Sequence, residues 1–204
     1  MKRLLQLPLR LLRCSQNASR NCKRKYYLFS FRYQAIVNKV RLTVADTACC
    51  DHPIFCVGSG DIIIEQNVKL GYYGAMANGQ PIMLQPRSGG VIKIQEGTII
   101  VNGTEIVACE RVEIGKQCRI GSRTFIIDSD FHGLKPTVRD TPGKTLPVRI
   151  GDNVLIGANS AILKGVIIGN DAVIGACSVV SRGIEPGDIV CGNPARVVGS
   201  VYKQ

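Results

Sequence analysis

An aliphatic residue returns every six positions through much of this 204-residue chain. From residue 150 to residue 180 the spacing holds without a gap, through Ile150, Ile156, Ile162, Ile168, Ile174 and Val180, and before an interruption it holds through Ile114, Ile120 and Ile126. An α-helix repeats near 3.6 residues and a strand repeats at 2, so neither accommodates a period of six as one long element. The period predicts a solenoid whose coil has three flat faces, each made of one short strand and one tight corner.

Small residues accompany the repeat at fixed offsets. A glycine directly follows most of the repeated residues, at positions 115, 121, 151, 157, 169 and 175, and a small or β-branched residue comes four positions after most of them. We interpret the glycines as permitting the corner backbone and the later residues as fitting beside the neighbouring face. A helical alternative is rejected, because each of these glycines would cost roughly 1 kcal/mol in a helix interior.

The same spacing begins earlier, in another phase, from residue 61. It runs through Ile64, Leu70, Ile82, Ile94, Ile100 and Ile106, with Met76 and Ser88 at positions where aliphatic residues are expected. The step from Ile106 to Ile114 is eight residues, so two extra residues within 107–112 are predicted to bulge from one coil. Residues 71–90 are rich in Gly, Pro and Gln and are predicted to form an irregular coil with a protruding loop.

A longer interruption separates Ile126 from Ile150. It contains Pro136, Pro142, Gly143 and Pro147, and residues of this kind form turns rather than the interior of a stacked coil. We predict a protruding loop at about 129–147. A long loop in an otherwise regular scaffold is usually functional.

The charge of the chain is concentrated at its N-terminus. The chain has 26 Lys and Arg against 15 Asp and Glu, and residues 1–44 hold eleven of the basic residues and none of the acidic ones. The sequence therefore predicts two parts, a basic N-terminal arm at 1–44 and a repeat domain at 45–204. Because the repeat domain is electrically balanced, no nucleic-acid partner is expected.

Two interpretations of the arm remain open. The arm could cap the open end of the solenoid or pack on a neighbouring subunit, or its leucines and basic residues could lie on an anionic membrane surface as a partly helical segment. No stretch approaches the ~20 apolar residues that span a bilayer. Nine cysteines without a CxxC pair indicate reduced thiols and predict a cytoplasmic protein, with the inner face of the membrane as the alternative location.

The predicted loop holds the residues best suited to acid–base chemistry. His132 lies beside Asp128, Asp130 and Phe131; imidazole exchanges a proton near neutral pH, and a neighbouring carboxylate could fix its tautomer. The alternative is a solvent-exposed loop histidine. Asp130 is a second catalytic candidate, although a lone pair of aspartates could equally cap a turn. His52, which precedes a proline, is interpreted as a turn residue.

Other polar candidates lie in the repeat itself. Asn102 could donate a hydrogen bond to a bound hydroxyl or carbonyl, or it could simply form an Asn-Gly corner. Lys164, Arg182 and Arg196 could reach phosphate groups, or each could sit on a solvated corner. No metal site is predicted, because the chain has only two histidines and no CxxC pair.

The repeat, the histidine loop and the ending GNPARVV together resemble the hexapeptide-repeat acyltransferases, most of all the galactoside, maltose and polysaccharide O-acetyltransferases, over roughly residues 60–200. The resemblance implies an all-β, left-handed parallel β-helix that works as a homotrimer with active sites between subunits. It also implies acetyl-CoA as the acyl donor. His132 matches the family's catalytic base, and Asn102 lies within one residue of its acceptor-binding asparagine. The positions that match cofactor contacts are Ala158, Ala176, Ser181, Arg182 and Arg196, to which Lys164 is added as a phosphate-binding candidate.

Some residues depart from the family pattern. Leu155 stands where some members have a tryptophan beside the cofactor, and the loop lacks the second histidine of the sugar acetyltransferases.

The predicted function is acetyl transfer from acetyl-CoA to a hydroxyl of a sugar or polysaccharide. The alternatives are transfer to the amino group of a nucleotide-linked amino sugar and a structural β-helix subunit without catalysis.

Overall fold

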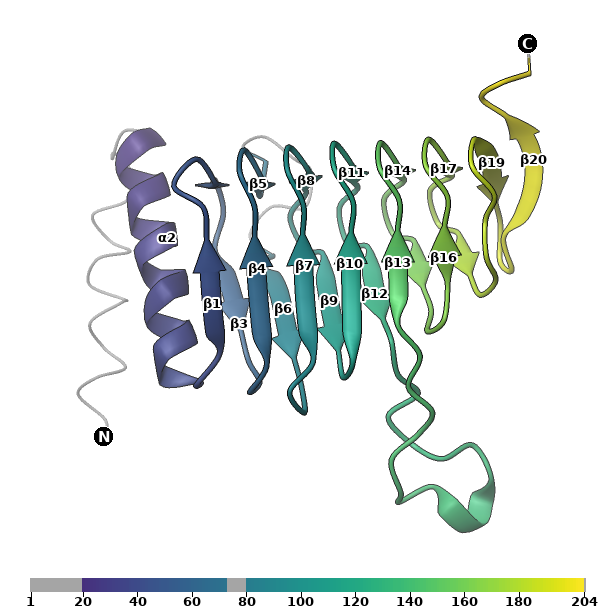
Figure 1. The fold of residues 1–204 in the computed structure, drawn as a ribbon, viewed down its shortest axis with the longest axis horizontal. Coiled ribbons are helices and arrows are strands. Elements are labelled where there is room, and N and C mark those ends of the chain that lie inside the picture. The colour runs from purple at the N-terminus through teal and green to yellow at the C-terminus, as the bar shows by residue number, and fades with distance from the viewer. Residues whose placement is uncertain (1–19, 73–79, 204) are drawn as a thin grey trace.

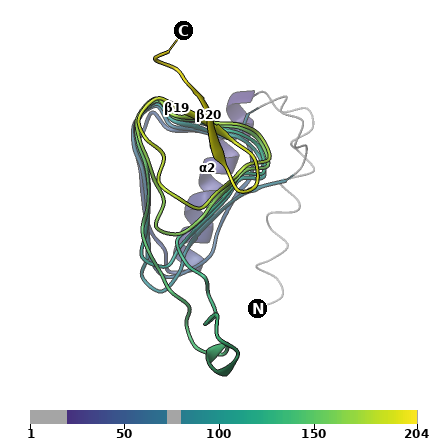
Figure 2. The same ribbon diagram turned by 90° about the vertical axis from the view of Figure 1, so that its right-hand side faces the viewer.

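The strands wind into a solenoid of triangular cross-section (Figures 1 and 2). The computed structural model describes residues 20–72 and 80–203, so the predicted leucine-rich segment around Pro8 and the position of Met76 lie outside the described residues. Each coil contributes one strand to each of three sheets. Within the coil all pairings are parallel, and the β19–β20 pair at the C-terminal end is antiparallel.

The three sheets are named here A, B and C in the order in which the chain enters them. Sheet A contains β1 (Arg41–Val44), β4 (Asp61–Ile64), β7 (Val91–Ile94), β10 (Arg111–Ile114), β13 (Val148–Ile150) and β16 (Ile167–Ile168). Sheet B contains β2 (Cys49–Cys50), β5 (Lys69–Leu70), β8 (Ile99–Ile100), β11 (Arg119–Ile120), β14 (Leu155–Ile156), β17 (Val173–Ile174), β19 (Asp188–Cys191) and β20 (Arg196–Ser200). Sheet C contains β3 (Ile54–Cys56), β6 (Ile82–Pro86), β9 (Glu105–Ala108), β12 (Phe125–Ile127), β15 (Ala161–Ile162) and β18 (Val179–Val180).

The coil is left-handed, as expected. In Figure 1 the strands of sheet A rise on the near side, the chain crosses the top in sheet B, and it descends on the far side in sheet C while advancing toward the C-terminus. This arrangement of short parallel strands confirms the predicted all-β class and the predicted parallel β-helix.

The repeated aliphatic residues form three columns inside the coil. In sheet A, for example, Ile94 pairs with Ile114 and Ile114 pairs with Ile150, and each of the three is at most 4% exposed. Each coil covers the apolar side chains of the coil before it. At about 25 cal/mol for each Å² of apolar surface removed from water, this stacking is the main stabilising contribution.

Two details of the repeat differ from the prediction in the earlier coils. Leu84, rather than Ile82, pairs with Ile106 in the inner column of sheet C. Residues are inserted after β5, and the six-residue spacing does not continue through the insertion. Ser88 lies in a corner with φ 52°, so no aliphatic side chain is required there. Residues 82–86 form the regular strand β6, so the predicted irregular coil at 71–90 is too broad.

The role predicted for the repeat glycines is also partly wrong. The left-handed corner conformation falls two residues later, on Gln117, Asn153 and Asn159 among others, with φ between 56° and 59°. Gly115 instead allows close approach, because a Cβ there would collide with the carbonyl oxygen of Gly151 in the next coil. Glycine is needed for the spacing between coils, and the turn itself is made by other residues.

The small polar residues in the repeat also do more than fill space. The hydroxyls of Thr124 and Ser178 donate hydrogen bonds of 2.8 and 2.6 Å to the carbonyls of Gly121 and Gly175. Both side chains are at most 1% exposed. They satisfy corner carbonyls that the parallel ladder leaves unpaired, which a buried backbone group requires.

A helix closes the N-terminal end of the coil. Helix α2 (Arg20–Val37) lies across the first coil (Figure 1) and buries Phe31 and Ala35 against it. The capping interpretation of the arm is therefore confirmed for residues 20–37. The predicted boundary at residue 44 is too late, because β1 (Arg41–Val44) already pairs with β4 as the first strand of sheet A.

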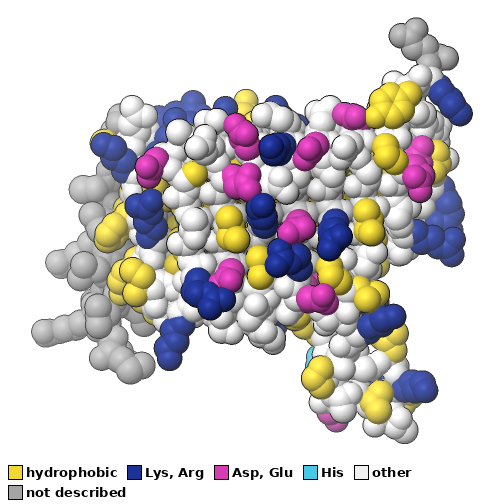
Figure 3. All heavy atoms as spheres, viewed as in Figure 1, with side chains coloured by type: hydrophobic (Ala, Val, Ile, Leu, Met, Phe, Trp, Pro, Cys, Tyr) yellow, Lys and Arg dark blue, Asp and Glu magenta, His cyan; other side chains and the backbone are white. Residues whose placement is uncertain are grey.

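The predicted loop at 129–147 projects from the side of the coil between β12 and β13 (Figure 1) and carries the short 3₁₀ helix η1 (Pro136–Val138). On the coil face in Figure 3, acidic and basic side chains are interspersed. Lys93 and Glu65, for example, form an ion pair at 3.1 Å. Among the described residues, no helix combines the length and the hydropathy needed to cross a bilayer.

The cap helix is held to the coil by a cluster of two arginines and one buried carboxylate. Arg24 bonds both carboxylate oxygens of Asp51, and Arg20 lies 3.1 Å from one of them. The carboxylate of Asp51 is only 4% exposed. The hydrogen bonds from Arg24 lower the pKa of Asp51, against the opposing effect of burial, and Arg20 lowers it further.

We expect the Asp51 cluster to make stability depend on pH. Because the folded pKa of Asp51 lies below its unfolded value, the stabilisation is present above about pH 4 and is lost as pH falls through the folded pKa. Replacing Asp51 with Asn should lower the unfolding free energy measured with urea by ~1–3 kcal/mol at neutral pH, and the difference should shrink in acid. The exposed Asp46→Asn change is the control and should have no effect at either pH. This account would be contradicted if Asp51→Asn lowered the unfolding free energy by the same amount at acid and neutral pH.

Candidate functional site

The projecting loop begins and ends as a narrow two-stranded root. Isolated bridges pair Ser129 with Thr145 and His132 with Pro142. The amide of Asp130 donates to the carbonyl of Lys144 at 3.0 Å. The loop leaves the coil at the corner between sheets C and A, because it lies between β12 and β13.

His132 lies on this root with its ring oriented by the loop itself. Its Nδ1 atom is 2.9 Å from the carbonyl oxygen of Arg139. A carbonyl can only accept a hydrogen bond, so Nδ1 carries a proton, and in the neutral ring Nε2 is the nitrogen with the free lone pair. The group that orients the ring is therefore a peptide carbonyl and not one of the neighbouring carboxylates. The ring lines an open groove of about 540 Å³, together with Cys109, Phe131 and Thr141 among others.

Asp128 has a structural role instead of a place beside the ring. Its side chain is fully buried and accepts three backbone hydrogen bonds, from Cys109 at 2.8 Å, Glu110 at 2.7 Å and Arg111 at 2.8 Å. Cys109 and Glu110 form the corner between β9 and β10, and Arg111 begins β10; both strands pair in continuous register with the coil before them, so the bulge predicted within 107–112 is not seen. Asp128 therefore fixes the neighbouring corner on which the loop rests.

Asp130 and Lys164 are paired with each other. The Nζ atom of Lys164 lies 2.6 Å from a carboxylate oxygen of Asp130, and both side chains are at most one-quarter exposed. Lys164 belongs to the coil that follows the loop, so the pair ties the loop root to that coil. The amide of Gly165 adds a 2.9 Å hydrogen bond to the carbonyl of Leu146 at the other end of the loop.

The residue before His132 has an unusual backbone conformation. Phe131 has φ 61°, a region that bulky residues seldom occupy. Its amide donates to the hydroxyl of Ser129 at 3.1 Å, and the guanidinium of Arg87 lies 5.0 Å from the centre of its ring. Arg87 in turn donates to the side chain of Gln85 in β6 at 2.6 Å. A cation–π contact from the coil thus holds the loop at the residue directly before His132.

Nothing in the residue spacing indicated the contact between Arg87 and Phe131, or that of Arg139 with His132. The first depends on how the loop folds back on the coil, since 44 positions separate Arg87 from Phe131, and the second depends on how the loop folds on itself. The φ of Phe131 could not be foreseen either, because sequence rules favour Gly or Asn in that region.

Asn102 lies at a different edge of the solenoid. It is 3% exposed, its oxygen accepts from the amide of Tyr72 at 2.9 Å, and its Nδ2 atom donates to the carbonyl of Tyr72 at 3.3 Å. It thereby anchors the start of the insertion that follows β5. Asn102 is in the corner between sheets B and C, and the four residues of β9, about 13 Å at ~3.3 Å per residue, separate that corner from the corner that carries the loop.

The B–C edge also carries two of the predicted cofactor positions. Ala158 and Ala176 occupy this corner in successive coils, where the amide of Cys177 donates to the carbonyl of Ala158 at 2.9 Å. A shallow groove of about 290 Å³ runs along the edge, lined by Val101, Leu155 and Ala158 among others. At 47% exposure, the side chain of Leu155 is open to that groove.

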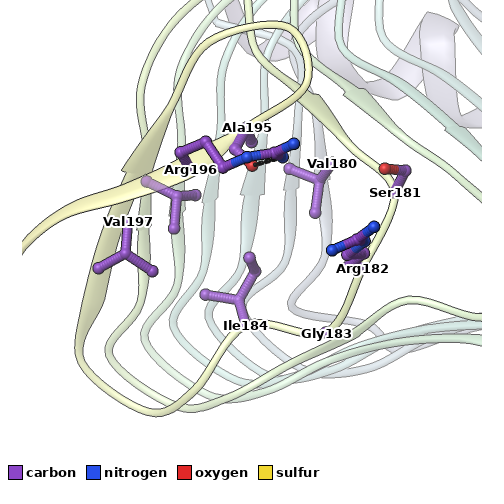
Figure 4. Close-up of a pocket in the computed structure, with 9 residues that line it drawn as sticks. Val180, Ser181, Arg182, Gly183, Ile184, Ala195, Arg196 and Val197 are labelled. Atoms are coloured by element: carbon purple, nitrogen blue, oxygen red, sulfur yellow. Dashed lines mark hydrogen bonds between the residues drawn. The ribbon is translucent and has the colours of Figure 1, made fainter.

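A second hollow lies at the C-terminal end. It measures about 180 Å³ and is lined by Ser181, Arg182 and Arg196 (Figure 4). Arg182 comes from the chain just after β18, and Arg196 begins β20, which turns back beside β19. The amide of Ala195 donates to the carbonyl of Val179 at 2.9 Å, so Arg196 stands at the end of the B–C edge.

Within one chain, the predicted site residues therefore lie on two different edges of the solenoid. His132, Asp130 and Lys164 lie at the C–A edge, whereas Asn102, Ala158, Ala176 and Arg196 follow one another along the B–C edge. Ser181 and Arg182 lie in the last corner after sheet C, where they line the end hollow together with Arg196. No group of three or more potential metal ligands occurs within residues 20–72 and 80–203.

The contact between Arg87 and Phe131 predicts a specific local effect. Replacing Arg87 with Ala should raise amide hydrogen exchange in residues 129–145 at least about twofold, because a cation–π contact contributes ~0.5–1 kcal/mol or more. Exchange in β14 to β18 should stay unchanged. Arg123→Ala, at an exposed corner away from the loop, is the control and should leave the loop protected. Unchanged exchange in the loop of Arg87→Ala would show that the root hydrogen bonds alone hold Phe131.

Comparisons with known proteins match the repeat and the fold. The family model "Bacterial transferase hexapeptide (six repeats)" matches residues 147–182. A 2,3,4,5-tetrahydropyridine-2,6-dicarboxylate N-acetyltransferase from Halalkalibacterium halodurans is 40% identical over 91 residues, which is 45% of this chain and 34% of that protein. The chain thus matches about a third of the length of this curated relative.

Solved structures extend the likeness to most of the chain. A hexapeptide-repeat acetyltransferase from Vibrio cholerae O1 biovar eltor, solved with acetyl coenzyme A, is 29% identical with a TM-score of 0.57, over 67% of this chain and 72% of that one. The polysialic acid-specific acetyltransferase NeuO has a TM-score of 0.67 at 24% identity, over 80% of this chain and 73% of its own, which speaks to the fold alone. Residues 147–182 thus match the hexapeptide-repeat family model, and the fold of the chain is similar to that of solved hexapeptide-repeat acetyltransferases.

Proposed function

We propose that this protein is an acetyl-CoA-dependent acetyltransferase that acts on a sugar hydroxyl, with His132 as general base. The observation that carries the proposal is the orientation of His132. Its Nδ1–H is held by the carbonyl of Arg139 at 2.9 Å, which leaves Nε2 as a proton acceptor beside an open groove. A histidine with one nitrogen fixed by a backbone carbonyl is suited to accept and return one proton.

In the proposed reaction, Nε2 of His132 takes the proton of the acceptor hydroxyl as its oxygen attacks the thioester carbonyl of acetyl-CoA. The resulting tetrahedral oxyanion is stabilised by backbone N–H groups. The carbon–sulfur bond then breaks, the proton returns to the thiolate, and CoA leaves as the free thiol. A sugar hydroxyl is too weak an acid to lose its proton unaided near neutral pH, so this transfer is where the histidine accelerates the reaction.

The B–C edge and the hollow at the C-terminal end of the coil together have the shape and chemistry for the donor. The narrow groove beside Leu155 and Ala158 suits the thin pantetheine arm, and the guanidinium groups of Arg182 and Arg196 with the hydroxyl of Ser181 suit phosphates. Acetyl coenzyme A is bound in the solved Vibrio cholerae structure, and coenzyme A in a solved galactoside acetyltransferase at 26% identity. Under this proposal Lys164 acts through Asp130 by holding the loop root, and it binds no phosphate.

The proposed site is shared between subunits of a trimer. The base lies at the C–A edge and the donor track lies at the B–C edge, on opposite sides of sheet C. A contact between unlike edges is heterologous and closes into a ring when each chain is rotated by a third of a turn. The loop also presents apolar side chains outward, with Leu134 77% and Val138 39% exposed, and a neighbouring chain would cover them.

Transfer to an amino group is the second candidate. One observation favours it: the curated relative with 40% identity over 91 residues is an N-acetyltransferase. That match covers less than half of this chain. A screen for thiol release across monosaccharides, nucleotide-linked amino sugars and polysaccharide fragments separates the two candidates, since an amine acceptor would retain activity after every hydroxyl is blocked.

Replacing His132 with Ala should lower kcat at least about a hundredfold, because a positioned general base contributes 10²–10⁴-fold in rate. Acetyl-CoA at about 100 times its Kd should still stabilise the variant by ~2.7 kcal/mol in a thermal shift assay, as it does the wild type. Lys135→Ala, exposed on the same loop, is the matched control and should retain both properties. If the protein were a structural subunit, acetyl-CoA would stabilise none of the variants. If His132→Ala kept a near-normal kcat, another residue would be the general base, and Asp130 would be tested next.

A mixing experiment tests the shared site. Ala158→Trp fills the groove on the B–C edge, and His132→Ala removes the base on the C–A edge, so each variant alone should be inactive. Co-expressed in equal amounts, they should recover about a quarter of wild-type activity, because random trimers in which each site uses two chains contain that share of intact sites. Mixed trimers without recovered activity would mean that each chain builds its own site.

A further inference from the structure

We propose that the outer face of helix α2 docks the protein on an anionic lipid membrane. The inference does not rest on the proposed catalytic function. It starts from the helix that caps the coil, whose two faces differ sharply. One face buries Phe31 and Ala35, and the other presents large apolar and basic side chains to solvent.

The exposed face is continuous along the helix. Lys25, Phe29, Arg32 and Ile36 follow one another at spacings of four, three and four residues, which places them on successive turns of one face. All four are exposed, with Phe29 at 65% and Ile36 at 77%. Single exposed apolar residues are ordinary, but an aligned row on a helix indicates a binding surface.

The flanking residues extend this face without reversing its charge. Tyr33 and Val37 are 40% and 59% exposed, and Lys39 is exposed just beyond the helix end. The sequence of α2 contains no Asp or Glu. The acidic residue near the helix, Asp51, lies on the coil side and is bonded by Arg20 and Arg24. An apolar row bordered by basic residues is the pattern of a helix that lies in a membrane interface.

The chemistry of the face favours lipid over a second copy of the same surface. Two α2 faces packed together would bring Lys25 and Arg32 of one chain near the same cations of the other, which is unfavourable. An anionic bilayer offers phosphate groups to Lys25, Arg32 and Lys39 while Phe29 and Ile36 enter the acyl boundary.

The position of α2 makes such docking possible. The helix lies across the end of the solenoid and its 18 residues extend about 27 Å at ~1.5 Å per residue. In Figure 1 the loop that bears His132 projects from the side of the coil, well away from α2. A membrane that meets the end of the coil therefore contacts the whole outer face and leaves the loop open to acceptor molecules.

Vesicle co-sedimentation of the full-length protein tests the proposal. We expect binding to phosphatidylcholine vesicles that contain about 30% phosphatidylglycerol, little binding to phosphatidylcholine alone, and weaker binding at high salt. The double variant Phe29→Ser/Ile36→Ser keeps the net charge and should bind at least about tenfold more weakly. Lys25→Glu/Arg32→Glu should lose binding to a similar extent. These side chains are solvent-exposed, so thermal melting of the variants should match the wild type.

Matched changes elsewhere serve as controls. Ile167→Ser, at a side chain 58% exposed on sheet A, and Lys69→Glu, exposed on sheet B, should leave vesicle binding unchanged. The proposal is overturned if the wild type does not bind, if it binds neutral vesicles equally well, or if Phe29→Ser/Ile36→Ser binds like the wild type. It is also overturned if that variant changes the oligomeric state in sedimentation velocity, since the face would then join copies of the chain.

Discussion

The structure depends on the hydrogen-bond register between successive coils. A coil of this size cannot bury its own aliphatic residues, and it becomes stable only when the next coil pairs with it in register. The parallel pairing places Ile94, Ile114 and Ile150 on top of one another, so that side chains of the same kind stack. The same pairing requires the backbones to approach closely at the corners, where a Cβ on Gly115 would meet the backbone of Gly151. Spacing and burial therefore constrain each other, and this constraint keeps the period of six so strict in the late coils.

This constraint explains why most of the fold could be predicted from the sequence. A column of buried aliphatic residues leaves a period in the sequence, and so Ile150 to Val180 indicated the coil without any long-range information. The first coil was missed because Val44, Cys50 and Cys56 occupy its inner positions, and cysteine did not count as a repeat residue. The cap helix leaves no hexapeptide pattern, and the charge of residues 1–44 alone could not separate a cap from a membrane segment.

The candidate site was predictable as a set of residues but not as a geometry. His132 stood out because it lies on a proline-rich interruption, and interruptions in a regular scaffold are visible in sequence. Its partner was not predictable, because the Arg139 carbonyl that orients the ring is a backbone atom that any residue could supply. Asp128 and Asp130 have the same charge and lie two residues apart, yet one is bonded to three corner amides and the other to Lys164. Only the path of the loop distinguishes them.

Where the chain leaves the coil, a buried polar side chain marks the exit. Asn102 bonds both backbone groups of Tyr72 at the insertion after β5, and Asp128 bonds three amides of the corner beside the loop after β12. A departing loop interrupts the ladder and leaves backbone groups that neither water nor the next coil can satisfy. A buried amide or carboxylate makes several hydrogen bonds at one point, and these offset the free-energy cost of removing the side chain from water. The two insertions lie on the two edges that border sheet C, so each anchor fixes one insertion to its own edge.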